Sequence, residues 1–272
     1  AYVKVAQLVN GINYFSDWAF SEFSLAVDAP ATPTISPSYN SSTGAVDVSI
    51  FGRTNVLSEN QASLETNTTG WEAIANCAIA RTTAQASDGS ASLSLTASAS
   101  GDMTAGTTAA TKFTVSASKK FSATAEFRAD TTARSTSVGI RFLNSAGTEI
   151  STIFGTAEND SSSAWNEVNV TATAPALATH ARVIVKVASA GTAEVHYVDK
   201  IGFHAGETPT WTSGGFSNFA FDVERSIDGG TTYSVLRSSP VTADSSQIAT
   251  IRDFEFPFDT TFEYRAKSRA DK

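Results

Sequence analysis

The sequence has very little sulfur and no long apolar segment. One cysteine and one methionine occur among its 272 residues. A single cysteine excludes a disulfide within the chain, and the half-apolar run around Cys77, residues 75–80, predicts a small core residue and not a reactive thiol. No run of about 18 apolar residues is present, so the sequence contains no candidate transmembrane helix and no membrane insertion is expected.

Positive charge is also scarce. The chain carries 19 Lys and Arg against 27 Asp and Glu, a formal net charge of -8, and its longest basic cluster is Lys119-Lys120. Because a nucleic-acid partner requires a basic face that neutralises phosphates, this balance argues against nucleic-acid binding. The chain lacks a signal-peptide pattern and an initiator methionine, begins inside a strand-like run and stops without a closing strand, so we expect it to be a piece of a longer protein.

The residues that are abundant favour β-structure. Thr, Ser and Ala are common, and hydrophobic residues make up 41% of the chain, which is enough for packed cores. The runs 45–50 and 221–225 alternate between apolar and polar residues, as half-buried strands do, and Asp228-Gly229 is a strong turn signal. We therefore predict an all-β fold.

The order of the strand-like runs indicates one domain interrupted by another. Residues 31–53 supply two strands without local partners, and runs of the same type resume at Trp211 and continue to the C-terminus. Residues 54–206 between them form a self-contained set of strands. Because exposed loops tolerate insertions and face solvent, an inserted domain is typical of a displayed recognition module and not of an enzyme.

The segments that flank residues 54–206 contain further strand-like runs. Residues 1–29 contain the string FSDWA at 15–19, and they resemble the last two strands of a fibronectin type III domain. Residues 30–53 together with 207–272 resemble a second such domain, which is split and lacks its last strand. Pro30 marks the junction between the two, because proline is confined to strand edges and turns.

Residues 54–206 contain a series of strand-like segments in a characteristic order and spacing: DGSASLSL (88–95), FSATAEFRA (121–129), VGIRFLNSAGTEI (138–150) and EVHYVDKIGF (194–203). In this order and spacing they resemble the β-jelly-roll carbohydrate-binding modules found beside xylanases and other glycanases. The nested arrangement as a whole resembles minor tail proteins of phages that infect actinobacteria. This resemblance implies an immunoglobulin-like fibronectin type III sandwich interrupted by a β-jelly-roll sandwich.

The resemblance to these modules implies a structural calcium ion. Glu65 on the opening strand and Asp199 in YVDKI fall on carboxylate positions of the family, and the loop that begins at Asp88 falls where backbone carbonyls contribute. Lys200 stands where many relatives carry a second acid. The alternative is that Glu65 and Asp199 belong to an ordinary hydrogen-bond network near Lys200.

Sugar binding needs aromatic side chains that cover the apolar face of a pyranose and planar polar groups that bond its hydroxyls. Two strands of the inserted part alternate, so Glu126, Arg128 and Arg141 point away from the core and are predicted to line one open sheet face. The alternative is a solvated ladder of ion pairs. No exposed aromatic residue is evident on these strands, and we interpret Trp71 and Trp165 as packing residues.

No motif in the sequence indicates catalysis, so we expect a protein that is not an enzyme. The three histidines do not show metal-ligand spacing, and the glycine patterns of nucleophile elbows and phosphate-binding loops are absent. The preferred function is a structural and adhesive component of a phage tail tip. It implies a location in the virion, outside the cell, with a host cell-surface glycan and other tail proteins as partners. A homo-oligomer would raise a weak single-site affinity.

Two other function classes stay open from the sequence. One is a non-catalytic module that targets a secreted glycanase to polysaccharide. The other is a purely architectural virion module that binds no sugar, which the lack of an aromatic platform favours.

Overall fold

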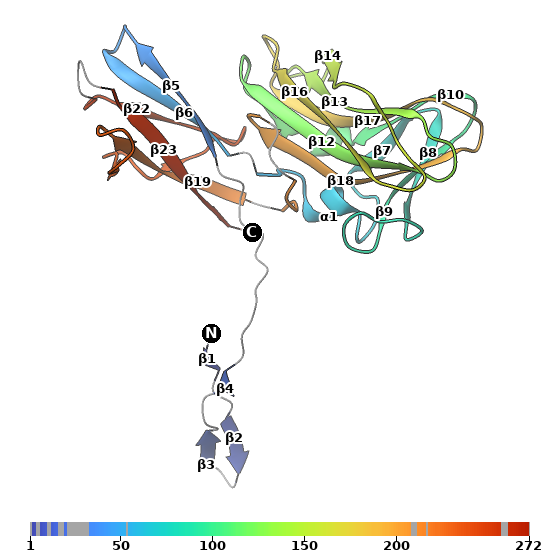
Figure 1. The fold of residues 1–272 in the computed structure, drawn as a ribbon, viewed down its shortest axis with the longest axis horizontal. Helices are drawn as coiled ribbons and strands as arrows, with labels where there is room; N and C mark the ends of the chain where they lie inside the picture. Colours follow the sequence, from blue (N-terminus) through green and yellow to red (C-terminus); the bar gives the residue numbers. More distant parts are fainter. Residues whose placement is uncertain are drawn as a thin grey trace.

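The computed structural model describes residues 33–52, 54–207, 211–215, 217–256 and 261–271, together with four short strands nearer the N-terminus (Figure 1). The rest of the predicted fibronectin-like segment 1–29 lies outside the described residues. No helix in the described part is long and apolar enough to cross a membrane. The four short strands pair as β1 with β4 and β2 with β3, and they are β1 (Tyr2–Val3), β2 (Ala6–Val9), β3 (Ile12–Phe15) and β4 (Ala19–Phe20).

Two small sheets pack into one sandwich, which we call the host sandwich. Its first sheet has the order β22-β6-β5 and consists of β5 (Thr34–Asn40), β6 (Ala45–Phe51) and β22 (Ile248–Asp253). In its second sheet a central strand, β19 (Ser217–Ser226), pairs with β20 (Ser234–Val235), β21 (Val241–Thr242) and β23 (Glu263–Asp271). Apolar residues of both sheets meet in one core that includes Val46, Val48, Ile50, Phe221, Val223, Ala249 and Ile251.

The host sandwich is built from chain segments on both sides of residues 54–206. β6 pairs antiparallel with β22, with Phe51 opposite Ile248, so the blue and red strands lie together in Figure 1. The chain leaves and re-enters the host at neighbouring points, since the amide of Gly215 donates to the carbonyl of Leu57 at 2.8 Å. The segments before and after the insertion therefore share a sheet, while the exact domain limits stay a prediction.

Residues 54–206 form a second, larger sandwich, which we call the guest sandwich. Its sheets differ in size, and its two helices, α1 (Glu59–Ser63) and a 3-10 helix (Ala109–Thr111), are short. The seven-stranded sheet contains β14 (Glu149–Phe154), β13 (Ser135–Leu143), β17 (His180–Ala190), β10 (Gly101–Thr107) and β7 (Trp71–Ala75) in that order, with β11 (Phe113–Thr114) on β17 and β15 (Glu158–Asn159) on β13. The five-stranded sheet has the order β16 (Asn166–Thr173), β12 (Lys120–Ala129), β18 (Val195–Ala205), β9 (Ser92–Ala97) and β8 (Cys77–Thr82).

These sheets confirm the predicted all-β class, in which one sandwich interrupts another. Alternation of side chains along each strand decides which residues fill the guest core. Trp71 is buried, as expected of a packing residue, and its indole nitrogen donates to the carbonyl of Gln61 at 3.1 Å. Trp165 and Cys77 are half-buried, and burial raises the pKa of the Cys77 thiol. The core-facing residues of β12 and β13 are Phe121, Ala123, Ala125, Phe127, Val138, Ile140 and Phe142.

Candidate functional site

The predicted calcium residues all lie at one loop, residues 87–91. Glu65 Oε1 accepts hydrogen bonds from the amides of Ser90 and Ala91, both at 3.0 Å. On the other side of the loop, Asp199 Oδ2 accepts from the amides of Ser87 at 2.7 Å and Asp88 at 3.0 Å. The two carboxylates therefore hold the two ends of the loop.

This arrangement does not fit a calcium site. A cation needs oxygen ligands that face it, whereas the Glu65 and Asp199 carboxylates face N–H donors. In the described ranges no group of three or more His, Cys, Asp or Glu side chains is placed to hold a metal ion. Glu65 and Asp88 line one open hollow that Asp199, which is fully buried, does not line.

Thermal unfolding with and without calcium tests whether the ion implied by the family resemblance binds. Because backbone amides already satisfy Glu65 and Asp199, we expect millimolar calcium to leave the melting temperature within about 1 °C of its value in EDTA. A rise of several degrees that saturates with calcium would contradict the arrangement described above and support the family resemblance.

Asp199 also gives the guest a pH-dependent stability. Burial raises the pKa of this carboxyl to about 6, although the amides of Asp88, Ser87 and Lys200 lower it. The folded state therefore binds more protons than the unfolded state between about pH 4 and pH 6, so the free energy of unfolding falls as the pH rises through that window. We expect a loss of about 2 kcal/mol. Denaturant unfolding in EDTA at several pH values measures it, and Asp199→Asn should flatten the profile; an unchanged slope would contradict the assignment.

The predicted sugar-binding residues are not brought together. Glu126 and Arg128 lie on β12 in the five-stranded sheet, whereas Arg141 lies on β13 in the seven-stranded sheet. Core-facing residues of these two strands meet inside the sandwich, so their outward-facing residues are on opposite sides of the guest. The prediction that the three side chains line one open sheet face is therefore wrong.

Each of the three residues has partners in its own surroundings. Glu126 accepts from the hydroxyl of Ser87 and pairs with Lys200, whose Nζ lies 3.3 Å from Oε1. Arg128 donates to the carbonyl of Ser162 at 2.7 Å. Arg141 pairs with Glu149, with 3.1 Å between Nε and Oε2. On β12 these contacts agree with the alternative of a solvated ladder of ion pairs. A role of the three residues in sugar binding stays a prediction.

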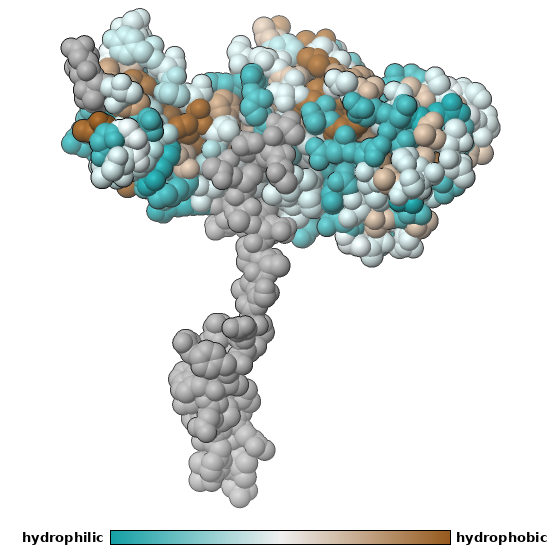
Figure 2. Space-filling view, in the orientation of Figure 1, coloured by the Kyte–Doolittle hydropathy of each residue, from teal (hydrophilic) through white to brown (hydrophobic). Residues whose placement is uncertain are grey.

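An exposed aromatic side chain lies on the same outer face as Arg141. Phe154 is 38% exposed and stands opposite Gly139 in the register of β14 and β13. A Cβ atom on Gly139 would come within 3.0 Å of two atoms of the Phe154 ring, so glycine is what allows the ring to approach the sheet this closely. Figure 2 shows hydrophobic surface around the position of β14. Sequence reasoning missed Phe154 because the strand was interpreted only as far as Ile150; the glycine within a regular strand was the available signal.

Apolar side chains also lie on this outer face beside Phe154, one of them covered by its neighbours. Ile184 lies opposite both Gly139 and Gly106 in the strand register, and a Cβ on Gly106 would collide with the end of its side chain. Ile184 is fully buried yet lies outside the guest core, as a residue of the outer face would. Ile74 contacts the same glycine from β7. We call Phe154, Ile184, Ile74 and the two glycines the Phe154 face.

Ion pairs flank the Phe154 face on two sides. Arg141 pairs with Glu149, and Arg182 pairs with Glu72. Lys186 pairs with Asp102 at 2.7 Å, and its Nζ also lies 5.9 Å from the centre of the Phe154 ring. Each cation therefore has a carboxylate partner, and the face offers an apolar ring surrounded by groups that both donate and accept hydrogen bonds.

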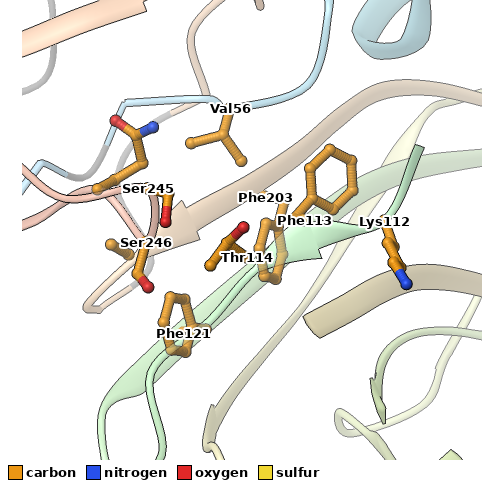
Figure 3. A pocket seen from close by; sticks show the side chains of 10 residues that line it. Val56, Lys112, Phe113, Thr114, Phe121, Phe203, Ser245 and Ser246 are labelled. Carbon is orange, nitrogen blue, oxygen red and sulfur yellow. The ribbon is translucent and has the colours of Figure 1, made fainter. Parts of the chain in front are cut away.

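Two cavities lie where the guest meets the host. The first, of about 220 Å³, is walled by Phe113, Phe121 and Phe203 of the guest and by Ser245 and Ser246 of the host (Figure 3). Phe203 stacks on both neighbouring rings, with centroids 5.2 and 5.8 Å away. The second cavity, of about 340 Å³, is lined by residues of β5, by Phe51 and by the guest turn that contains Lys119.

The contacts around these cavities join the two sandwiches. The Ser116 and Ser246 hydroxyls are 2.9 Å apart, and the Trp211 indole donates to the carbonyl of Ile201 at 3.2 Å. Ile248, at the start of the host strand β22, belongs to the hydrophobic core of the guest. The junction is therefore a packed interface in addition to the two covalent connections.

Comparison with known proteins shows similarity at the level of fold. No family model matches the sequence, and no curated protein matches it. Similar solved structures include the CBM22-1 xylan-binding domain of Paenibacillus barcinonensis Xyn10C, with 14% identity, 53% of this chain and 91% of that chain covered, and a TM-score of 0.44. The tandem CBM22-1–CBM22-2 domain of the same protein has 9% identity, 79% and 84% coverage, and a TM-score of 0.44.

A phage protein is also among the similar structures. The enzymatically active domain of bacteriophage CBA120 tailspike protein 4 has 15% identity, covers 56% of this chain and 21% of that chain, and has a TM-score of 0.41. Similarity this low carries no argument about what the chain binds.

Proposed function

We propose that this protein binds carbohydrate through the Phe154 face. The observation that carries the proposal is the partly exposed ring of Phe154, which lies against Gly139 on the outer face of the sheet. Among the described residues of the guest it is the one aromatic side chain that is more than a third exposed. A ring in this position covers the C–H face of a pyranose.

The ion pairs beside the ring supply the polar contacts that a sugar needs. Hydroxyl groups both donate and accept hydrogen bonds, and the Arg141–Glu149 and Lys186–Asp102 pairs offer both functions. One ring and a few hydrogen bonds give a weak single site. Several copies on one particle would raise the overall affinity, because tethered sites act at a high effective concentration.

The nested architecture supports a role in display on a phage tail tip. The chain leaves the host sandwich and returns to it at neighbouring points. This arrangement suits a guest module that projects sideways from a row of sandwich domains. In this proposal the protein is a minor tail protein of a virion, a homo-oligomer that contacts other tail proteins and the host cell surface. A non-catalytic module of a secreted glycanase would use the same face, and a glycoside hydrolase in the same reading frame would favour that alternative.

Binding of the full chain to glycans tests the proposal. Biotinylated protein assembled on streptavidin would be applied to arrays of bacterial cell-wall polysaccharides and plant xylans. We expect selective retention of the tetramer and much weaker retention of the monomer. No retention of the multimer on any polysaccharide would reject the function.

The architectural alternative has one observation in its favour. Ile150, Ile153 and Phe154 are all exposed on the edge strand β14, and a neighbouring subunit would also cover such a surface. A cross-link from β14 to another tail subunit in an assembled particle, together with no glycan binding, would support this alternative.

A further inference from the structure

We propose that the larger junction cavity binds the carboxylate of an acidic sugar residue. The cavity of about 340 Å³, which we call the Lys119 cavity, is formed jointly by the host and the guest. Its volume lies near the lower end of the roughly 300–1,000 Å³ typical of small-molecule sites. It is lined by Thr34, Ile35, Ser36, Phe51, Ser118, Lys119, Lys120, Gly206 and Glu207.

Lys119 supplies a positive charge that no carboxylate neutralises. Its Nζ donates to the Ser49 hydroxyl at 3.3 Å and lies 6.0 Å from the centre of the Phe51 ring. No ion pair joins it to an acid in the described part of the chain, although acids outnumber bases in the sequence. By contrast, carboxylate partners lie within 3.3 Å of four other lysines: Lys120, Lys186, Lys200 and Lys267.

The backbone fixes Lys119 in this position. Ser118 has a φ of 63°, in the left-handed region that a serine rarely adopts. The Ser118 amide donates to the carbonyl of Ala174, and the Ala174 amide donates back to the carbonyl of Lys119, both at 2.8 Å. The turn is thus held against the end of β16 while its lysine extends to the host strand β6, so the charge is pre-organised between the two sandwiches.

The rest of the lining suits a sugar that carries the acid. The half-buried Phe51 ring offers apolar contact, while the hydroxyls of Thr34, Ser36 and Ser118 can bond sugar hydroxyls. A carboxylate would form a charge-assisted hydrogen bond with the Lys119 ammonium. Lys120 is already paired with Glu207 at 2.6 Å, so Lys119 is the group that distinguishes an acidic from a neutral sugar.

Titration of the full chain with methyl glucuronide and methyl glucoside tests the proposal. We expect the uronide to bind at least tenfold more tightly than the glucoside. Lys119→Met, which keeps the aliphatic length and removes the charge, should weaken uronide binding at least tenfold. Lys267→Met, a matched change on the far sheet of the host, should alter it less than twofold. Equal binding of the two sugars, or an unaffected Lys119→Met variant, would overturn the proposal.

Two further measurements distinguish recognition of a sugar acid from general anion binding and from a folding defect. Inorganic phosphate that binds as tightly as the uronide would reject recognition of a sugar acid. If Lys119→Met fails to fold, as judged by thermal unfolding, Ser36→Trp at an exposed position of the lining blocks the cavity and should abolish uronide binding. The proposal is independent of the Phe154 face: Phe154→Ala should leave uronide binding unchanged, so either site can fail without the other.

Discussion

Phe154→Ala should weaken glycan binding by the multimerised protein at least tenfold. The variant removes the one exposed aromatic platform described on the guest, and aromatic contacts of this kind contribute about 1.5 kcal/mol, or roughly tenfold in affinity per site. Several sites on one particle multiply the loss. The ring rests on Gly139 at the sheet edge and outside the guest core, so we expect the melting temperature to change little.

Phe254→Ala is the matched control for this experiment. Phe254 is 65% exposed on the host sandwich, so the same atoms are removed from a surface to which no sugar contact is assigned. This variant should be retained as strongly as the parent protein on the polysaccharide that the array identifies as a ligand. Equal retention of Phe154→Ala and the parent protein would show that the Phe154 face is not the glycan-binding site.

Gly214→Ala should be the most destabilising single change at the junction. Gly214 lies where the chain returns from guest to host, and a Cβ atom there would come within 3.0 Å of the carbonyl oxygens of Leu57 and Ser58. Leu57 and Ser58 lie where the chain enters the guest, and Ser58 is the N-cap of α1. A shift of either carbonyl would therefore move the entering segment away from the returning segment, which it contacts through the hydrogen bond from the Gly215 amide to the Leu57 carbonyl. We expect a loss of about 3 kcal/mol, or roughly 6–12 °C in melting temperature.

Gly44→Ala separates this effect from the general cost of replacing glycine. Gly44 has a φ of +64° but no atom within 4 Å of the added Cβ, so only backbone strain of about 1 kcal/mol opposes the change. Differential scanning calorimetry compares the two variants. A Gly214→Ala protein no less stable than Gly44→Ala would show that the entering and leaving segments do not lie against each other.

Alternation along the strands predicted which side chains face a core but not which side of the molecule the others occupy. Phe127 and Phe142 alternate with the outward-pointing residues and do lie in the guest core. Glu126 and Arg141 were expected on one face because both point away from that core. The strands that carry them follow each other in sequence but enter different sheets, and a period of two does not contain that information.

Contacts between distant loops were even less accessible from the sequence. Glu65 and Asp199, which the resemblance implied as calcium ligands, both accept hydrogen bonds from the loop of residues 87–91. The sequence did not show that amides of that loop would occupy their oxygens. The junction charge of Lys119 was likewise invisible, because its surroundings come from β5, β6 and the returning chain, which only the folded protein brings together.

A designed disulfide tests the pairing across the insertion most directly. Asp47 on β6 and Arg252 on β22 are register partners with an exposed ion pair, so cysteines at both positions lie within bonding reach in an antiparallel sheet. In a Cys77→Ser background, mild oxidation followed by proteolysis and mass spectrometry should yield one disulfide-linked peptide pair containing positions 47 and 252. A folded protein whose two thiols both remain free after oxidation would show that the two flanks lie in separate sheets, and the nested architecture would be wrong.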